Sequence, residues 1–263
     1  MNIVVCVKRV PDLAEAEIVV DRSEKGIETE DLVFDINEWD NYAVEEAVLL
    51  KESIGGTVTA ISLGEEDSEE VLRRGLAVGA DNAILLNDRA FDGGDAFATA
   101  KALAAAIERN PFDLILTGAQ AADDGYAQVG ATLAEMLGIP HATLVTGLEI
   151  DGNVARVHRE LEAGLEEILD VRLPAVLTIQ TGINEPRYVS IAGIRRVARR
   201  EIEVLGAKDL GLSGDEVGAA GSRLEMQRLF VPPATQKGEI LEGSVDVTTE
   251  KLVSIFASKG WLA

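Results

Sequence analysis

The sequence predicts an α/β protein in which a parallel β-sheet carries helices on both faces, followed by added strands and an extended C-terminal arm. Three observations lead to this prediction. Short runs rich in β-branched residues alternate with helical runs through the first half of the chain, which is typical of a parallel sheet. Beyond Gly138, strand-like runs follow one another without intervening helices. From residue 205 to residue 247, the hydrophobic pattern has no period.

The first half of the chain supplies the strands and helices of the parallel sheet. We predict strands over 3–7, 57–63, 82–86 and 114–117, and helices over 42–53, 68–77, 97–109 and 128–137. Asn41 is a candidate N-cap for the first helix, an acidic first turn suits the dipole of the second, and Gly138 is a natural stop for the fourth. Parallel sheets bind ligands at the carboxyl ends of their strands, so a binding site is expected there.

The second half adds strands over 142–150, 154–160 and 173–181, with Asp151-Gly152-Asn153 as a hairpin turn. We therefore predict a folded domain over residues 1–204 and an arm over residues 205–263. The arm ends in a helix over 250–258, which follows Thr249 and stops at Gly260. An aperiodic stretch of about forty residues cannot bury its own apolar groups in a core. It either drapes over its own domain or packs on another subunit with its apolar residues, which are Leu224, Leu229, Phe230 and Val231.

Composition excludes several classes of protein. The 263 residues include 24 basic and 46 acidic ones, giving a formal net charge of -22, so nonspecific binding of nucleic acid is disfavoured. No apolar run approaches the ~20 residues that span a bilayer, and the N-terminus lacks the apolar region of a signal peptide. The single cysteine, Cys6, cannot form an internal disulfide or a cysteine-based zinc cluster. We expect a soluble cytoplasmic protein with no nucleic-acid partner and no membrane insertion.

Patterns that carry catalysis are sparse. His141 and His158 lie in strand-like segments without a partner at metal-ligand spacing, and nucleophile-elbow, H-E-x-x-H and P-loop patterns are absent from the sequence. Carboxylates are abundant, but in a chain of this charge they usually form a solvated face. The sequence therefore predicts no catalytic residue and no metal site.

The segment 114–137, LILTGAQAADDGYAQVGATLAEML, is the first that suggests a ligand. A strand ends at Gly118, a loop of small residues with two aspartates follows, and a helix begins near Gln128. Small residues let backbone amides approach a ligand, and a helix N-terminus favours phosphate. Asp123 and Asp124 would repel phosphate if they pointed inward, so we expect them to bond the loop backbone or a ribose hydroxyl. Nucleotide binding and an ordinary strand–loop–helix connection both remain open.

The second suggestive segment is 184–200, NEPRYVSIAGIRRVARR. It contains no acidic residue from 187 to 200 and five arginines, which are Arg187, Arg195, Arg196, Arg199 and Arg200. Ile191 has small neighbours and would protrude if the segment is a surface loop. An exposed apolar anchor ringed by positive charge suits docking to an acidic partner. A basic helix face paired with the protein's own carboxylates is equally compatible with this composition.

The whole chain resembles the beta subunit of electron transfer flavoproteins. The resemblance is carried by VHRELEAGLEEILDVRLPAVLT at 157–178, followed by INEPRY at 183–188. Further motifs agree with that family in order and spacing: VKRVPD at 7–12, YAVEEAVLLKE at 42–52, LAVGAD at 76–81, GAQAADDGYAQVG at 118–130, and the C-terminal VPP with its closing helix.

The resemblance implies a Rossmann-like adenine-nucleotide-binding domain over residues 1–204, with residues 205–263 packing on an alpha subunit that carries the redox-active FAD. Family members are electron carriers and not enzymes in their own right. They accept electrons from dehydrogenases, typically acyl-CoA dehydrogenases, and pass them to a quinone oxidoreductase or another acceptor. The beta subunit holds AMP in simple carriers and a second FAD in electron-bifurcating members.

The resemblance also implies site residues. Ile191 falls where the family carries an apolar anchor that inserts into the dehydrogenase, beside the docking arginines Arg195, Arg196 and Arg199. The family's pattern assigns nucleotide binding to four places in the chain, whose residues are Cys6, Asn37, Glu38, Trp39, Asp40, Leu63, Gly118, Ala119, Gln120, Ala121, Ala122, Asp123, Asp124, Gly125, Tyr126, Ala127, Gln128 and Val129.

The loop at 123–130 is intermediate between the two kinds of family member. Bifurcating members resemble D-G-D-T-A-Q-V-G, whereas this chain reads D-D-G-Y-A-Q-V-G, with Tyr126 in place of a threonine whose hydroxyl would face the phosphates. Simple carriers often read D-D-x-x-N-Q-T-G, which Ala127 and Val129 do not match. The segment NEWD at 37–40 also departs from the N-P-x-x form common in both. We favour AMP over a second FAD.

Two functions of a different class are weaker alternatives. An adenylating or ATP-pyrophosphatase enzyme on this type of fold would need an S-G-G-x-D-S-type loop after the first strand, where the chain reads VKRVP at 7–11. A stand-alone nucleotide sensor would need neither the basic segment nor the arm.

Overall fold

The computed structural model describes residues 1–12, 18–233 and 238–262. Within these residues nine strands form one sheet in the order β11-β5-β4-β1-β6-β10-β7-β8-β9. The strands from β11 to β7 run parallel, and β8 and β9 are added antiparallel at one edge. The bounds are β1 Asn2–Cys6, β4 Thr57–Leu63, β5 Asn82–Leu86, β6 Leu114–Gly118, β7 His141–Asp151, β8 Val154–Glu160, β9 Glu166–Arg172, β10 Ala175–Ile179 and β11 Glu203–Leu205. A separate antiparallel ribbon joins β2 Arg9–Pro11 to β3 Phe34–Ile36.

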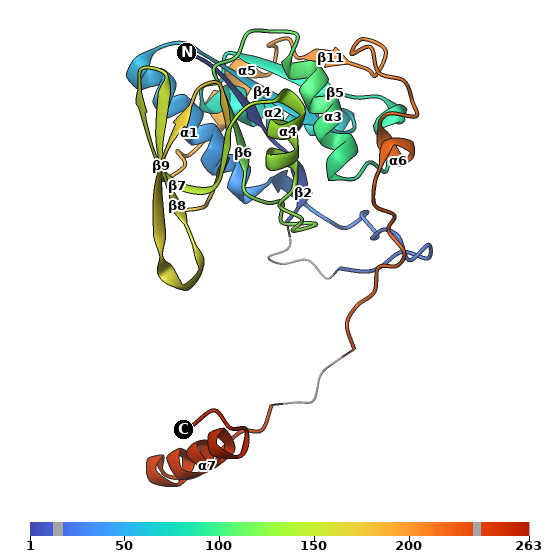
Figure 1. Cartoon of the computed structure of the whole chain (residues 1–263). Helices are drawn as coiled ribbons and strands as arrows, with labels where there is room; N and C mark the ends of the chain where they lie inside the picture. Colours follow the sequence, from blue (N-terminus) through green and yellow to red (C-terminus); the bar gives the residue numbers. More distant parts are fainter. Residues whose placement is uncertain (13–17, 234–237, 263) are drawn as a thin grey trace.

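Helices cover both faces of the sheet (Figure 1). One face carries α1 (Glu38–Ile54), α2 (Glu69–Val78) and α5 (Ile191–Val197). The other carries α3 (Ala96–Ile107) and α4 (Val129–Leu137), with the short α6 (Gly218–Gly221) against α3. Three short 3-10 turns are η1 Glu66–Ser68, η2 Arg89–Phe91 and η3 Glu162–Gly164, and the closing helix α7 spans Val245–Ser258. The α/β fold with a mainly parallel sheet is therefore confirmed.

Alternation of side chains along the strands separates two cores. In β6, Leu114 and Leu116 belong to the core under α1 and α2, whereas Ile115 belongs to the core under α3 and α4. All three are fully buried. Because both faces of the central strands are covered, these strands read in the sequence as nearly continuous apolar runs.

The strands were predicted more accurately than the helix starts. β4, β5 and β8 have the predicted bounds, and Gly152 turns the β7–β8 hairpin with a φ of +57°. β9 was not predicted, because its sequence EEILDVR belongs to an edge strand whose charged side chains face solvent.

Two helices begin four or five residues earlier than predicted. α1 begins at Glu38, and the N–H of Asn41 already donates to the carbonyl of Asn37 at 3.0 Å, so Asn41 lies inside the first turn and is not the cap. α7 begins at Val245, five residues before the predicted start, and the N–H of Thr248 donates to the carbonyl of Ser244 at 2.9 Å. The first turn of α1, EWDN, is mostly polar, which hides it from hydrophobic periodicity. The first turn of α7, VDVT, alternates valine with polar residues and so does not show a helical period.

The structure puts the first part of the predicted arm, residues 205–222, in the domain itself. β11 pairs with β5, and Leu205, Ala207 and Val217 are buried in the core beside α3. This segment closes the edge of the parallel sheet through turns, which is why it shows no period. The predicted boundary at residue 205 thus moves to about residue 223.

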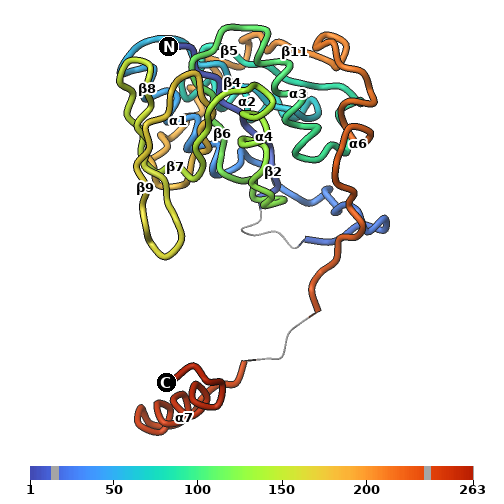
Figure 2. The backbone as a smooth tube through the Cα atoms, viewed as in Figure 1, coloured from blue at the N-terminus to red at the C-terminus, as the bar shows by residue number. Residues whose placement is uncertain are grey.

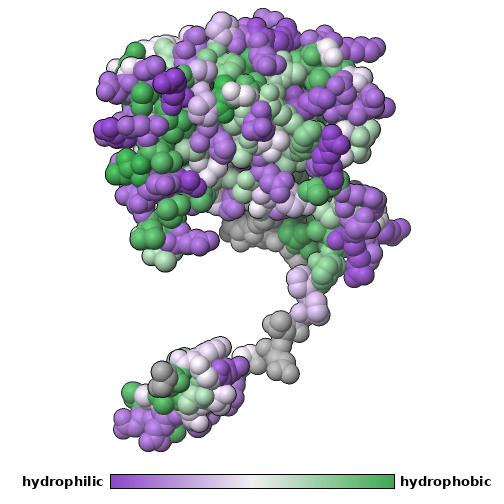
Figure 3. All heavy atoms as spheres, in the orientation of Figure 1, coloured by the Kyte–Doolittle hydropathy of each residue, from purple (hydrophilic) through white to green (hydrophobic). Residues whose placement is uncertain are grey.

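Beyond residue 222 the chain still bonds the body through the N–H groups of Arg223 and Leu224, which donate to Asp95, and that of Leu229, which donates to the carbonyl of Glu24. Figure 2 shows α7 standing apart from the body. Leu224, Phe230 and Val231 are 57%, 56% and 67% exposed. Within the described part of the chain, α7 contains no buried residue, and Figure 3 shows hydrophobic side chains on its surface. An extension of this kind leaves apolar surface uncovered by its own domain.

Candidate functional site

A cavity of about 380 Å³ opens at the carboxyl ends of β1, β4, β5 and β6. From β5 the chain crosses back past β4 and β1 to form β6, so the strand order reverses beside β1. Open parallel sheets bind ligands at such a switch point. The predicted site residues that line the cavity are Cys6, Asn37, Asp40, Leu63, Gly118, Ala119, Gln120, Ala121, Asp124, Tyr126, Ala127, Gln128 and Val129.

The other five predicted residues lie outside the lining of the described cavity: Glu38, Trp39, Ala122, Asp123 and Gly125. The indole N–H of Trp39 donates to Oε1 of Gln180 at 2.8 Å, which turns this side chain to a neighbouring loop.

Asn37 ties α1 to the loop that follows β6. Its side chain is buried, its amide nitrogen donates to the carbonyl of Gln120 at 2.8 Å, and its oxygen accepts the N–H of Ala122 at 3.0 Å. These bonds use both ends of the amide. Asn37 therefore shapes the loop 118–128 through its backbone.

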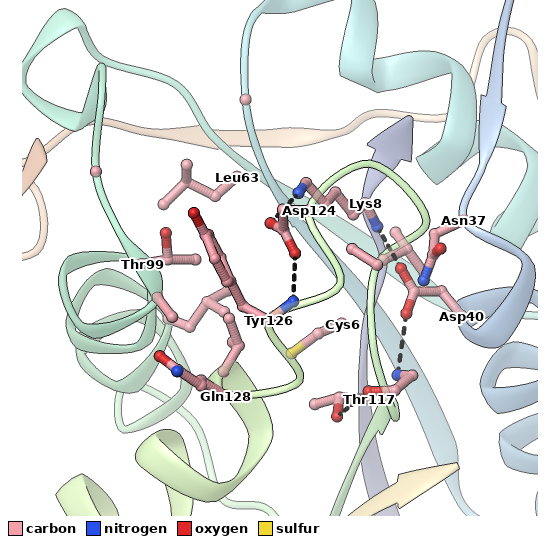
Figure 4. A pocket seen from close by; sticks show the side chains of 18 of the residues that line it. Cys6, Lys8, Asn37, Asp40, Leu63, Thr99, Thr117, Asp124, Tyr126 and Gln128 are labelled. Atoms are coloured by element: carbon pink, nitrogen blue, oxygen red, sulfur yellow. Dashed lines mark hydrogen bonds and ion pairs between the residues drawn. The ribbon is translucent and has the colours of Figure 1, made fainter. Parts of the chain in front are cut away.

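Asp40 joins the ends of two central strands. Its carboxylate accepts the backbone N–H of Lys8 at 2.8 Å and that of Gly118 at 2.9 Å (Figure 4). Burial raises the pKa of Asp40 to about 7, against the hydrogen bonds, which lower it. Burial, followed by the nearby Asp40 carboxylate, raises the pKa of the Cys6 thiol, so Cys6 is an uncharged wall of the cavity.

Lys8 is the only cation that lines the cavity among the described residues. Its Nζ lies 2.7 Å from a carboxylate oxygen of Asp123 and 2.9 Å from one of Asp124. Burial by itself lowers the pKa of Lys8, but the two carboxylates outweigh burial and raise it. Asp124 bonds the loop backbone, as expected from the sequence, because its Oδ1 accepts the N–H of Tyr126 at 3.0 Å. The partnership with Lys8 was not predicted.

The residues at the entrance of α4 line the cavity. Gly125 and Ala127 adopt left-handed angles, with φ of +63° and +55°, and the strained Ala127 lies in the lining. Within the described chain Gln128 makes no capping side-chain bond, and first-turn amides have no partner inside a helix. The ring of Tyr126 points into the cavity (Figure 4). A polar acceptor in the cavity could therefore bond these amides.

α4 approaches the sheet closely at Gly130. A Cβ placed there would lie 2.5 Å from Cγ2 of Thr178 and 2.8 Å from Oγ1 of Thr117, so only glycine fits. This contact fixes the helix entrance against the ends of β6 and β10.

Sequence reasoning missed one wall of the cavity, the loop after β5 and the start of α3. Its lining residues are Asn87, Asp88, Phe91, Asp92, Gly93, Gly94, Asp95, Ala96, Thr99 and Leu103. Asp95 caps α3 by accepting the N–H of Ala98 at 2.9 Å, and its other oxygen accepts the N–H groups of Arg223 and Leu224 at 2.7 and 2.9 Å. The available signal was a Gly-Gly-Asp sequence after a predicted strand.

The predicted docking residues lie on a separate surface, formed by α5. Ile191 is the first residue of this helix and is 67% exposed, so it protrudes from a helix and not from a loop. Arg195, Arg196 and Arg199 are exposed, and their side chains make no hydrogen bond or ion pair with any residue in the described ranges. Arg187, by contrast, pairs with Glu45 and Glu52 of α1.

Comparison with known proteins bears on what these two sites do. A family model described as the electron transfer flavoprotein domain matches residues 26–210. An electron transfer flavoprotein subunit beta from Thermoanaerobacterium thermosaccharolyticum is 42% identical over 98% of this chain and 99% of the relative. The chain belongs to the family of electron transfer flavoprotein beta subunits.

Two further relatives align with this chain over nearly the whole length of both proteins. One, from Methylophilus methylotrophus, is an electron transfer flavoprotein subunit beta that is 36% identical over 97% of each chain. The other, from Acetobacterium woodii, is the caffeyl-CoA reductase-Etf complex subunit CarD, which is 38% identical over 98% of this chain and 99% of the relative. The family name assigns the chain to electron transfer within a flavoprotein.

None of the helices over 1–12, 18–233 and 238–262 has the length and apolar character needed to cross a membrane. In the same ranges, no group of His, Cys, Asp and Glu side chains is arranged to hold a metal ion.

Proposed function

We propose that this chain is the beta subunit of a heterodimeric electron carrier and that its cavity binds AMP. In this proposal the alpha subunit carries the redox-active FAD, which accepts electrons from an acyl-CoA or related dehydrogenase and passes them to a quinone oxidoreductase or another acceptor. The observation that carries the proposal is the cavity at the switch point, which is lined both by the entrance of α4, a helix without a side-chain cap, and by one lysine.

The residues of the cavity fit an adenine nucleotide. Its volume lies within the ~300–1,000 Å³ usual for small-molecule sites. Leu63, Phe91 and Leu103 offer apolar surface for a base, while the amides at the entrance of α4 suit a phosphate. An ammonium has three donors, and the two aspartates take two of those of Lys8, so one is left for a phosphate oxygen.

The size of the cavity supports AMP over a second FAD. FAD contains the AMP group together with a second phosphate and the flavin, so it needs more room. The ring of Tyr126 takes up part of the space at the entrance of α4 (Figure 4). A second FAD remains the alternative, and it would make the complex electron-bifurcating.

The other surfaces complete the proposed carrier. Ile191 and the free arginines of α5 would dock the dehydrogenase, because an exposed apolar anchor among cations suits an acidic partner. The extension from residue 223 to α7 would pack on the alpha subunit and cover the exposed Leu224, Phe230 and Val231.

Calorimetric titration of the nucleotide-depleted heterodimer tests the phosphate role of Lys8. We expect AMP to bind more tightly than adenosine, and Lys8→Met to weaken AMP about tenfold or more, since charge-assisted hydrogen bonds contribute ~1.5–3 kcal/mol. The affinity for adenosine should hardly change. Lys8→Arg should retain most of the preference for AMP over adenosine. Lys25→Met, which removes an exposed lysine outside the cavity, is the matched control. Equal loss of AMP and adenosine affinity would contradict the proposal.

A further inference from the structure

α5 is tied to the body of the protein just before its first turn. The Arg187 guanidinium bonds both oxygens of Glu45, at 2.9 and 3.0 Å, and both oxygens of Glu52, at 2.8 and 3.0 Å. Glu45 also accepts the backbone N–H of Arg187 at 3.0 Å, and its side chain is only 5% exposed. Two bidentate pairs on one guanidinium hold it in a single orientation.

A second residue of the same segment shares this anchorage. The side-chain nitrogen of Asn184 donates to the carbonyl of Tyr42 at 3.1 Å and to Glu46 at 3.0 Å. Successive turns of α1 therefore hold the chain at 184 and at 187. Tyr188 follows directly and is 87% exposed, so the segment enters solvent immediately after its anchor.

The other end of α5 is held by Arg73 of α2. One of its guanidinium nitrogens donates to the carbonyls of Val197, Ala198 and Arg200, at 3.3, 3.0 and 3.4 Å, while the other bonds Glu69 at 2.7 Å. The last carbonyls of a helix have no partner within it and carry the negative end of its dipole. The guanidinium of Arg73 gives these carbonyls hydrogen-bond partners, and its positive charge compensates the negative end of the dipole.

Between these ties, α5 lies on α2 by one face. Gly193 and Val197 are buried, whereas Ile191 on the exposed surface is turned to solvent. The helix has seven residues, and isolated helices shorter than ~12 residues are marginal in water. Its helical form therefore depends on its attachments to the body.

We propose that Arg187 and Arg73 are positioning residues that keep α5 folded and fixed before a partner arrives, so that Ile191 is presented ready to insert. Neither residue needs to touch the partner. A preformed anchor avoids the entropy cost of ordering the segment during binding, so the loss of either tie weakens docking. This inference rests on the docking function proposed above.

Steady-state reduction of the heterodimer by its donor dehydrogenase tests the inference. We expect Arg187→Met and Arg73→Met each to raise the apparent KM for the heterodimer about three- to tenfold, with kcat nearly unchanged. Arg187→Lys should recover little, because an ammonium cannot make two bidentate pairs. Reduction of the flavin by dithionite, which needs no docking, should keep its wild-type rate in every variant.

A matched control and a double-variant cycle sharpen the test. Arg156→Met removes another bidentate arginine–carboxylate pair, with Asp170, in the β8–β9 strands at the other end of the sheet, and it should leave the KM unchanged. Since Arg73 and Arg187 act through the placement of Ile191, adding either substitution to Ile191→Ala should raise the KM less than it does alone.

The outcomes separate the inference from the function on which it rests. If Ile191→Ala leaves the KM unchanged, the docking function itself is wrong. If Ile191→Ala raises the KM while Arg73→Met has no effect, or its effect multiplies fully with that of Ile191→Ala, only the positioning inference is wrong. Should Arg187→Met fail to fold because Glu45 is left unpaired, Arg73→Met decides, since its partners are backbone carbonyls and the half-exposed Glu69.

Discussion

Gly125 and Gly138 adopt nearly the same left-handed backbone, with φ of +63° and +65°, but only Gly125 lies in the loop beside the cavity. A Cβ at either position meets no described atom within 4 Å, so a valine would act through backbone strain and not through overlap. We expect Gly125→Val to reshape the loop and lose the nucleotide of this subunit while the alpha-subunit flavin is retained. Gly138→Val, strained at the far end of α4, is the control. Stoichiometric nucleotide in Gly125→Val would refute the role of this loop.

Ile191 is the residue on which the docking account depends. It is 67% exposed, so its truncation to alanine removes no core contact and should leave the flavin spectrum and the heterodimer unchanged. If it becomes fully buried in the partner, its side chain contributes ~1.5–3 kcal/mol, which corresponds to about ten- to a hundred-fold weaker association. The apparent KM in donor-driven flavin reduction measures this loss. A wild-type value for Ile191→Ala would show that α5 does not dock the donor.

Asp40 makes the stability of this chain depend on pH. Burial raises its folded pKa to about 7, above the ordinary value of 3.8. Between about pH 4 and 7 the folded state keeps a proton that the unfolded state loses, so this group lowers stability as pH rises through that window. Asp40→Asn cannot titrate, and the free energy of unfolding of the wild type should fall relative to that of the variant from pH 4 to 7. Chemical denaturation of both at several pH values measures the difference, and a constant difference would contradict the account.

At the scale of elements, the extension divides into a part that belongs to the domain and a part that leaves it. Truncation after Leu224 keeps β11, α6 and the Asp95 contacts, so the domain should stay folded by circular dichroism and lose binding to the alpha subunit. Truncation after Val204 also removes Leu205, Ala207 and Val217 from the core, and stability should fall by at least ~2 kcal/mol. Normal heterodimer affinity after truncation at Leu224 would contradict the assignment of the extension.

The strands differ in how well the sequence predicts them, and their burial explains the difference. β4 and β5 were predicted to the residue, because their apolar runs are bounded by polar residues and buried on both faces. β9 was missed, because an edge strand with one face in solvent carries the composition of a loop.

Within the candidate site, sequence reasoning found the loop of 118–129, whose small residues and following helix are neighbours in the chain. It missed Lys8, whose partners Asp123 and Asp124 are 115 and 116 residues away, since no local pattern reports such a pairing. The cavity wall at 87–99 could have been predicted, because the rule that places ligands at the carboxyl ends of strands applies to β5 as well.

At the scale of the whole molecule, the net charge of -22 opposes an acidic partner, whereas the exposed arginines of α5 attract one locally. Local attraction of this kind acts mainly on the rate of association and is screened within about 10 Å at 0.1 M salt. We expect Arg195→Glu to slow association with the donor in stopped-flow measurements, with an effect that shrinks as salt rises. An effect independent of salt would contradict electrostatic steering.

In one chain of the electron transfer flavoprotein family, the whole molecule combines a cavity that we propose binds a nucleotide, a helix that we propose docks a partner, and an extension. The central claim is that the cavity holds AMP, so that the redox-active flavin belongs to the alpha subunit alone. Mass spectrometry of the nucleotides released from the purified heterodimer tests this most directly. The account predicts AMP and FAD in equal amounts. FAD alone, at twice the amount of the heterodimer, would contradict it and make the complex a bifurcating one.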